Sequence, residues 1–200
     1  MQKTYNKIHF FFVYIVFSAI FFVMGLTLCY SIPIDSFIYS GLEENFIKGL
    51  DGIKDSAFFS LTNIIPVFLA EMKYVLFIIF ASFTKHRGYI FPALVSFKGF
   101  VIGISVACLM RSIKYGNVDV EYEFLFCSVF VILSVCLISV ICWLSATSLL
   151  YTDRLIFPLK INLIIKRKDT YAYLLDILAV CGALFIIVLL KIGNFKFMIS

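Results

Sequence analysis

Long apolar stretches separated by short polar segments dominate the hydrophobic pattern of this chain. Five stretches reach the length of about 20 helical residues that crosses a bilayer, namely residues 8–30, 57–83, 89–112, 124–151 and 171–192. These runs are too long and too uniformly apolar for barrel strands, and backbone inside a bilayer must satisfy its own hydrogen bonds. The pattern predicts an all-α integral membrane protein, with residues 1–200 forming a single transmembrane domain built as a five-helix bundle. The first stretch exceeds a signal-peptide core, so we expect it to be retained.

Two connecting segments have helical patterns of their own. Between the first two stretches, apolar residues recur at helical spacing, at Ile38, Leu42, Phe46, Leu50 and Ile53. This spacing predicts an amphipathic helix over about 36–56, with Asp35 or Ser36 as a possible cap. Its acidic polar side favours contact with the bundle or a partner over anionic lipid. The segment RLIFPLKINLIIKRK before the last stretch mixes apolar and basic residues and is expected at the opposite membrane interface. A solvated loop is the alternative for both segments.

Composition and charge agree with a membrane protein and add its orientation. The chain is 62% hydrophobic and 14% charged, which is too apolar for the surface of a soluble domain. Its net charge of +5 is spread over short loops without interleaved exposed aromatics, so nucleic acid is not an expected partner. Basic residues prevail in the N-terminal arm, the turn around residues 84–88 and the segment 153–169, whereas the other loops are mainly acidic. The positive-inside rule therefore predicts a cytoplasmic N-terminus and an outer C-terminus in a multi-pass protein of the cell membrane.

Four charged residues fall inside the predicted spans and away from their ends: Glu71, Lys73, Lys98 and Asp176. Such residues are costly unless paired or hydrated, and they often mark functional sites. At helical rise, Lys98 lies about 14 Å from the cytoplasmic end, within reach of either Glu71 or Asp176. We expect an intramembrane charge cluster that links the second, third and fifth spans. Structural pairing is the main interpretation, and a transport or relay role is the alternative.

The third span carries a row of small residues beside its lysine. Gly99, Gly103 and Ala107 are spaced four apart, and Ser96 extends the row towards the cytoplasm. Small residues at this spacing let a second helix approach closely, so we predict a helix-packing role for the row and a central position for this span. Asn63 in the second span could add a hydrogen bond between helices.

Catalytic chemistry is poorly represented in the sequence. The six cysteines lie in or at the edge of apolar runs without a C-x-x-C pair, which favours their interpretation as small buried apolar residues. The histidines are His9 and His86, and no H-E-x-x-H, G-x-S-x-G or P-loop occurs. Glu43 and Glu44 form a pair, but the arginine and later histidines of intramembrane metalloproteases do not follow. We expect no enzyme activity, cofactor or metal, and any ATP-driven function requires a partner.

The third span contains the segment YIFPALVSFKGFVIG, which follows a basic turn, KHRG, and a second span containing LTNIIPVF. These segments resemble the stage II sporulation protein M family. Lys98, Gly99, Phe100 and Gly103 match the family's N/K/R-G-F-x-x-G motif, and Asn63 stands where an asparagine often precedes it. The resemblance is strongest over residues 57–110. It implies a non-enzymatic membrane scaffold that anchors cell-wall-remodelling enzymes, with relatives beside peptide-export and bacteriocin-immunity systems.

The sequence is therefore compatible with three functions. The first is an assembly scaffold that docks partners through the outer helix and the surfaces of its spans. The second is the membrane subunit of an exporter or immunity system, whose separate ATPase docks at Lys166, Arg167 and Lys168 on the cytoplasmic side. The third is a small transporter or channel using Glu71, Lys98 and Asp176, although no internal repeat is evident.

Overall fold

The structure is a bundle of five long helices. The computed structural model describes residues 2–33, 36, 39–41, 44, 61–115, 123–156 and 163–198. The long helices are α1 (Gln2–Ser31), α3 (Leu61–Ser82), α4 (Arg87–Lys114), α5 (Glu123–Ile156) and α6 (Leu163–Met198). Each is long and apolar enough to cross a membrane. The predicted all-α, five-helix membrane architecture is confirmed.

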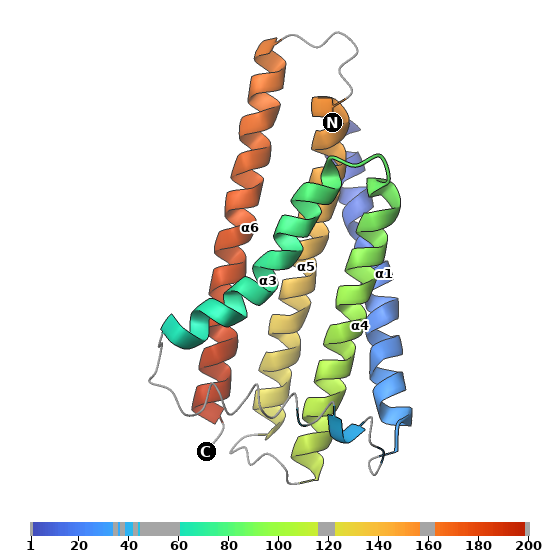
Figure 1. Cartoon of the computed structure of the whole chain (residues 1–200), viewed down its shortest axis with the longest axis vertical. Helices are drawn as coiled ribbons and strands as arrows, with labels where there is room; N and C mark the ends of the chain where they lie inside the picture. Colours follow the sequence, from blue (N-terminus) through green and yellow to red (C-terminus); the bar gives the residue numbers. More distant parts are fainter. Residues whose placement is uncertain are drawn as a thin grey trace.

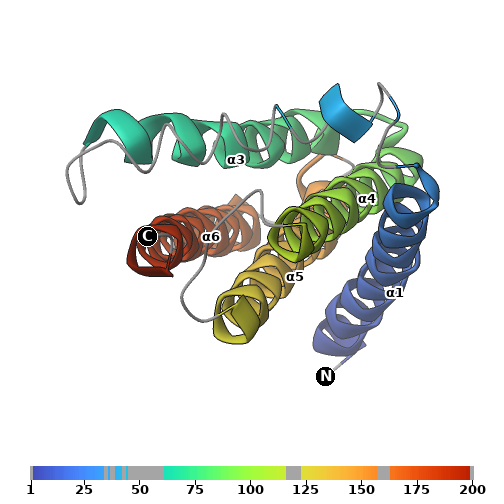
Figure 2. The same ribbon diagram turned by 90° about the horizontal axis from the view of Figure 1, so that it is seen from below.

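Four of the helices run along the length of the bundle, and the fifth lies across them. Helices α1, α4, α5 and α6 follow the long axis, with the N- and C-termini at opposite ends (Figure 1). Helix α3 crosses one face obliquely, from beside α6 to beside α4 (Figure 2). This layout places α4 between α1 on one side and α3 on the other.

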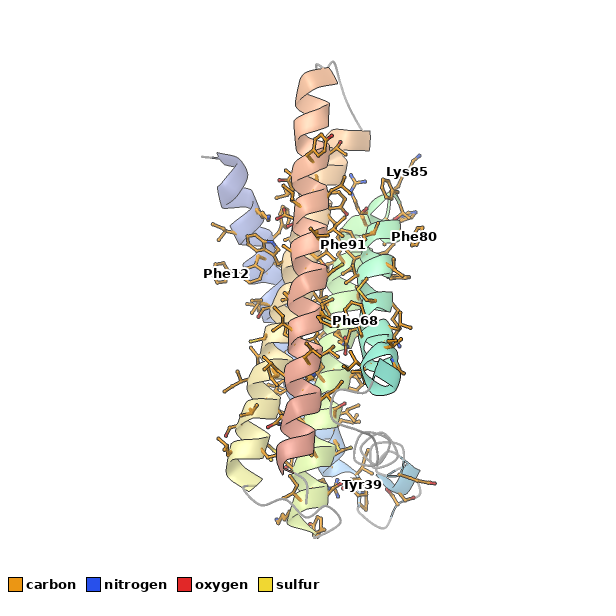
Figure 3. All side chains as sticks on the ribbon, turned by 90° about the vertical axis from the view of Figure 1, so that its left-hand side faces the viewer. Phe12, Tyr39, Phe68, Phe80, Lys85 and Phe91 are labelled. Atoms are coloured by element: carbon orange, nitrogen blue, oxygen red, sulfur yellow. The ribbon has the colours of Figure 1, made fainter. Side chains whose placement is uncertain are left out.

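Helix α4 is the most buried element, as its small residues and lysine suggested. In its apolar stretch 56% of the residues are buried, compared with 17% in α1. Phe91, from α4, is fully buried in the core, whereas Phe12 of α1 and Phe80 of α3 are 59% and 69% exposed and point outwards (Figure 3). Large apolar side chains thus divide between a core around α4 and a belt that faces lipid.

Several hydroxyl groups inside the spans form hydrogen bonds within their own helix. The hydroxyls of Thr27, Ser105 and Ser145 donate to carbonyl oxygens one turn earlier, at 2.9–3.0 Å. This back-bonding satisfies their donors without a partner from another helix. Pro66 and Pro92 lie near the starts of α3 and α4, and neither ends its helix.

The end of α5 and the start of α6 differ from the sequence prediction. Helix α5 continues to Ile156 and α6 already begins at Leu163, so Lys166, Arg167 and Lys168 belong to a helix and not to a loop. The segment LIIKRKDTY contains no Gly or Pro, and it does contain several good helix formers. The last helix can therefore extend at its N-terminal end. Helix α6 projects beyond the other helices at the end of the bundle where the N-terminus lies (Figure 1).

The segment between α1 and α3 is described only in part. Most of the predicted amphipathic helix at 36–56 lies outside the described residues. At its start, Tyr39–Gly41 are helical, and the Ser36 hydroxyl accepts a hydrogen bond from the Tyr39 amide at 3.2 Å. Ser36 therefore caps this turn, which is one of the two caps that the sequence offered.

Candidate functional site

Lys98 forms an ion pair with Glu71 between α4 and α3. The Lys98 ammonium nitrogen lies 2.6 Å from a Glu71 carboxylate oxygen, and the Lys98 and Glu71 side chains are only 7% and 17% exposed. The same ammonium lies 4.1 Å from the centre of the Tyr74 ring, one turn further along α3. The Lys98 ammonium therefore contacts both a carboxylate and the face of an aromatic ring. These contacts offset part of the free-energy cost of removing the charges from water.

The neighbour of Lys98 in sequence faces a different helix. Consecutive residues of an α-helix point about 100° apart. Lys98 reaches α3, whereas Gly99 lies against the backbone of Ser18 on α1. Lys98 and Gly99 thus join α4 to two of its neighbours, α3 by charge and α1 by close packing.

A second lysine, Lys191 of α6, belongs to the surroundings of this ion pair. Lys191 lies close enough to both Glu71 and Lys98 to interact with them electrostatically. Its ammonium nitrogen is 5.3 Å from the centre of the Phe130 ring of α5. One turn on, the Asn194 amide donates to the Phe126 carbonyl at 3.3 Å and fixes this part of α6 to α5. The sequence prediction missed Lys191, because it lies at the edge of the last apolar stretch.

The other two predicted members of the cluster, Asp176 and Lys73, are not part of this ion pair. The Asp176 carboxylate is 3.0 Å from the Lys7 ammonium, which also sits 3.9 Å from the centre of the Trp143 ring. Asp176 therefore joins α6 to α1 beside α5 and does not reach Lys98. Lys73 has an exposed side chain, 5.5 Å from the Tyr74 ring. The cluster expected over the second, third and fifth spans is therefore divided: Glu71 and Lys98 form one ion pair, on which the charge of Lys73 acts, and Asp176 forms another with Lys7.

The small residues of α4 form a close seam with α1. A Cβ atom on Gly99 or Gly103 would collide with the backbone carbonyl oxygen of Ser18 or Phe22, respectively. Gly25 of α1 meets the Phe100 carbonyl oxygen of α4 in the same way. The two helices run in the same direction with their backbones in contact, which is the arrangement that small residues at four-residue spacing permit.

The remaining predicted packing residues fit the same region only in part. Ser96 is buried on α4, 6% exposed, and Ala107 is fully buried beside Cys29 of α1. Asn63 belongs to α3, but its side chain lies outside the described residues. The same holds for the side chains of Lys166, Arg167 and Lys168 on α6.

Arg111 closes the seam at the end of the bundle that is predicted to face outwards. Its guanidinium donates to the carbonyl oxygens of Cys29 and, at 3.0 Å, of Ile32. The guanidinium carbon also lies 4.0 Å from the centre of the buried Tyr39 ring. Arg111 thereby satisfies carbonyls that the end of α1 leaves free and stacks on the segment that follows. The sequence prediction missed Arg111, because it lies at the margin of the third apolar stretch.

The fold and these contacts define an α-helical multi-pass membrane protein whose polar residues join its helices. In the part of the chain that the structure describes, no three His, Cys, Asp or Glu side chains gather in a way that could hold a metal ion. Comparison with family models, curated proteins and solved structures finds no match for this chain.

Proposed function

We propose that this protein is a non-enzymatic membrane scaffold that holds partner proteins at a bacterial cytoplasmic membrane. The observation that carries the proposal is the set of contacts that Arg111 makes with Cys29, Ile32 and Tyr39. These contacts tie the chain leaving α1 to the end of α4, and behind them the two helices pack backbone to backbone. The outer segment therefore departs from a rigid base, which reduces the conformational entropy lost when it holds a partner.

The ion pairs support a structural role for the charges within the membrane. Glu71–Lys98 joins α3 to α4, and Lys7–Asp176 joins α1 to α6. The first pair joins two consecutive helices and the second joins helices at the two ends of the chain, so both help to define the bundle. A scaffold needs such fixed helix positions, since its surfaces must stay in register for docking.

The class of partner comes from the resemblance in the third span. Residues Lys98, Gly99, Phe100 and Gly103 resemble the motif of stage II sporulation protein M, whose family anchors cell-wall-remodelling enzymes. We therefore propose extracytoplasmic wall-remodelling enzymes as partners, docked through residues 36–56.

Site-specific photo-crosslinking in intact cells tests on which side the partners bind. A photoreactive phenylalanine analogue replaces Tyr115, 49% exposed just beyond α4 at the outer end, or Tyr89, 80% exposed at the opposite end. The scaffold proposal predicts that Tyr115 captures an exported wall enzyme and that Tyr89 does not. Capture of cytosolic proteins alone, from Tyr89, would contradict it.

A second candidate is the membrane subunit of an exporter or bacteriocin-immunity system with a separate ATPase. The observation that favours it is the extension of α6 beyond the rest of the bundle, with Lys166, Arg167 and Lys168 on the projecting turns. A helical projection with basic residues would present a firm docking point to an acidic surface of a cytosolic protein.

Charge reversal tests the second candidate. Changing Lys166, Arg167 and Lys168 together to Glu should release a co-purifying ATPase, while Lys85→Glu at the exposed α3–α4 turn serves as the control. Equal ATPase recovery in the two variants would remove the proposed docking site.

A further inference from the structure

Two cysteines from different helices touch at the outer end of the α1–α4 seam. The sulfur atoms of Cys29 and Cys108 lie 3.6 Å apart, and the residues are 0% and 2% exposed. Their neighbours are the buried Ala107 and Tyr39 and the partly buried Leu26, Ile32 and Ile104. Cysteine is a common buried residue, but facing sulfurs on two helices also meet the first requirement of a disulfide.

The helices that carry the two sulfurs are held on both sides of the pair. Towards the membrane interior, Gly103 packs against the Phe22 backbone, which leaves no room for the helices to move closer. Towards the outside, Arg111 bonds the carbonyl oxygen of Cys29 itself. To reach the S–S bond length of about 2.05 Å the sulfurs must approach by roughly 1.5 Å, a distance that rotation of the two side chains can supply while the backbones stay in place.

The predicted orientation places this pair where disulfides persist. Cys29 lies two residues before the end of α1, at the end of the bundle predicted to face outwards. Disulfides are stable in oxidising extracytoplasmic surroundings and rare in the cytosol.

We propose that Cys29 and Cys108 are an oxidation site that closes into an inter-helix disulfide. The burial of both sulfurs favours a small oxidant of the hydroperoxide class over a protein thiol oxidase. One thiolate attacks the O–O bond of hydrogen peroxide; an S–O bond forms, the O–O bond breaks and water leaves, which gives a sulfenic acid. The second thiol then attacks that sulfur, the S–O bond breaks, the S–S bond forms and a second water leaves. Two thiols and one peroxide give one disulfide and two waters; both sulfurs are oxidised and both peroxide oxygens are reduced.

The consequence is a covalent clasp at the base of the outer segment. Cys29 and Cys108 are 79 positions apart in the chain, so the bond closes a long loop and restricts the unfolded state. The clasp holds α1 to α4 beside Arg111, where the chain leaves the membrane. This inference stands apart from the proposed scaffold function, because it concerns the covalent state of the seam whether or not a partner binds.

Thiol counting on the full-length protein in mild detergent tests the proposal. The reduced protein is treated with hydrogen peroxide, unreacted thiols are blocked with a maleimide mass tag in denaturant, and tagged peptides are sequenced by mass spectrometry. We expect four of the six cysteines to take the tag, a peptide joining Cys29 to Cys108, and six tags after reduction. Six tags without reduction, a bridge between other cysteines, or sulfinic acid without a bridge would overturn it.

Matched serine variants make the result specific. Cys29→Ser and Cys108→Ser should each give no bridged peptide after peroxide, whereas Cys136→Ser, at an exposed position on α5, should keep three reactive thiols and retain the bridge. The wild-type protein should also show a Tm several degrees higher when oxidised than when reduced. Loss of this shift in Cys29→Ser, with Cys136→Ser unchanged, is the expected pattern, and an equal shift in all variants would contradict the clasp.

Discussion

A lysine inside a membrane helix is tolerated when its ammonium group meets an anion or water. Lys98 meets Glu71 at 2.6 Å, and both side chains are largely shielded. Removing one partner of such a buried pair leaves the other charge uncompensated, which costs about 3–5 kcal/mol, whereas removing both is often nearly neutral. The stability of Lys98 variants should therefore depend on residue 71.

We predict that Lys98→Met strongly lowers the free energy of unfolding and that adding Glu71→Gln restores much of the loss. Methionine keeps the length of the lysine stem and removes its charge. A double-mutant cycle of denaturant unfolding in detergent micelles measures the coupling. If the effects of the two changes simply add, the pair does not stabilise the bundle.

Lys191 should behave in the opposite way to Lys7. Lys191 lies near Glu71, but the ammonium of Lys98 already contacts that carboxylate. Lys7, in contrast, itself forms the ion pair with Asp176. We predict that Lys191→Met raises the free energy of unfolding by on the order of 1 kcal/mol, since it removes a desolvated charge. Lys7→Met should lower it. Thermal unfolding of the purified variants measures both effects. A loss of stability in Lys191→Met would show that the bundle needs this lysine and would contradict the prediction.

At the scale of elements, the seam between α1 and α4 depends on the absence of side chains. A Cβ on Gly103 would collide with the Phe22 carbonyl oxygen and lie 3.1 Å from the Leu26 amide nitrogen. Backbone atoms cannot rotate away, so α1 has to move. We predict that Gly103→Ala lowers the free energy of unfolding by about 1–3 kcal/mol, as overpacking does.

Gly182 of α6 provides the matched control for the seam. A Cβ there would have nothing within 4 Å, and alanine is the better helix former by about 1 kcal/mol in water. Gly182→Ala should therefore be neutral or stabilising in the same unfolding measurement. Equal destabilisation of both variants would mean that the loss at Gly103 does not come from contact with α1.

The sequence predicts where the helices lie in the chain better than it predicts which helices pack against each other. Spans follow from the length of apolar runs, and the row of Gly99, Gly103 and Ala107 predicts a close-packed face. The row does not show which helix packs there. The contacts on α1 are Ser18, Phe22 and Gly25, and these residues form no obvious small-residue repeat that would identify α1 from the sequence. Depth alone also left Glu71 and Asp176 both within reach of Lys98. The oblique path of α3 brings Glu71 there, and the position of α1 gives Asp176 a different partner.

Residues at the margins of spans were the hardest to predict. Arg111 and Lys191 lie where an apolar stretch meets polar sequence, and charges at such positions usually extend to the interface. Arg111 instead caps α1, and Lys191 approaches the Glu71–Lys98 pair. Both contacts depend on tertiary packing, which the local pattern does not contain.

For the whole molecule, the distribution of basic residues makes a prediction about orientation. Five spans separate the termini, and the loops at the N-terminal end carry most of the positive charge. We expect a C-terminal alkaline phosphatase fusion to be active and a C-terminal green fluorescent protein fusion to be dark, because the former needs export and the latter the cytosol. An active phosphatase at the α3–α4 turn, around Lys85, would contradict this orientation and the location of the proposed outer site.

The measurement that tests the scaffold account most directly is quantitative mass spectrometry of the proteins that co-purify with the wild type and two variants. Arg111→Gln removes the guanidinium that ties Cys29, Ile32 and Tyr39 together, while Lys114→Gln changes an exposed basic residue one turn later on α4. The account predicts that extracytoplasmic partners per bait fall several-fold in Arg111→Gln and stay unchanged in Lys114→Gln, with both variants monodisperse. Unchanged partners in both variants, together with ion or proton flux in reconstituted vesicles that Lys98→Met abolishes, would contradict it.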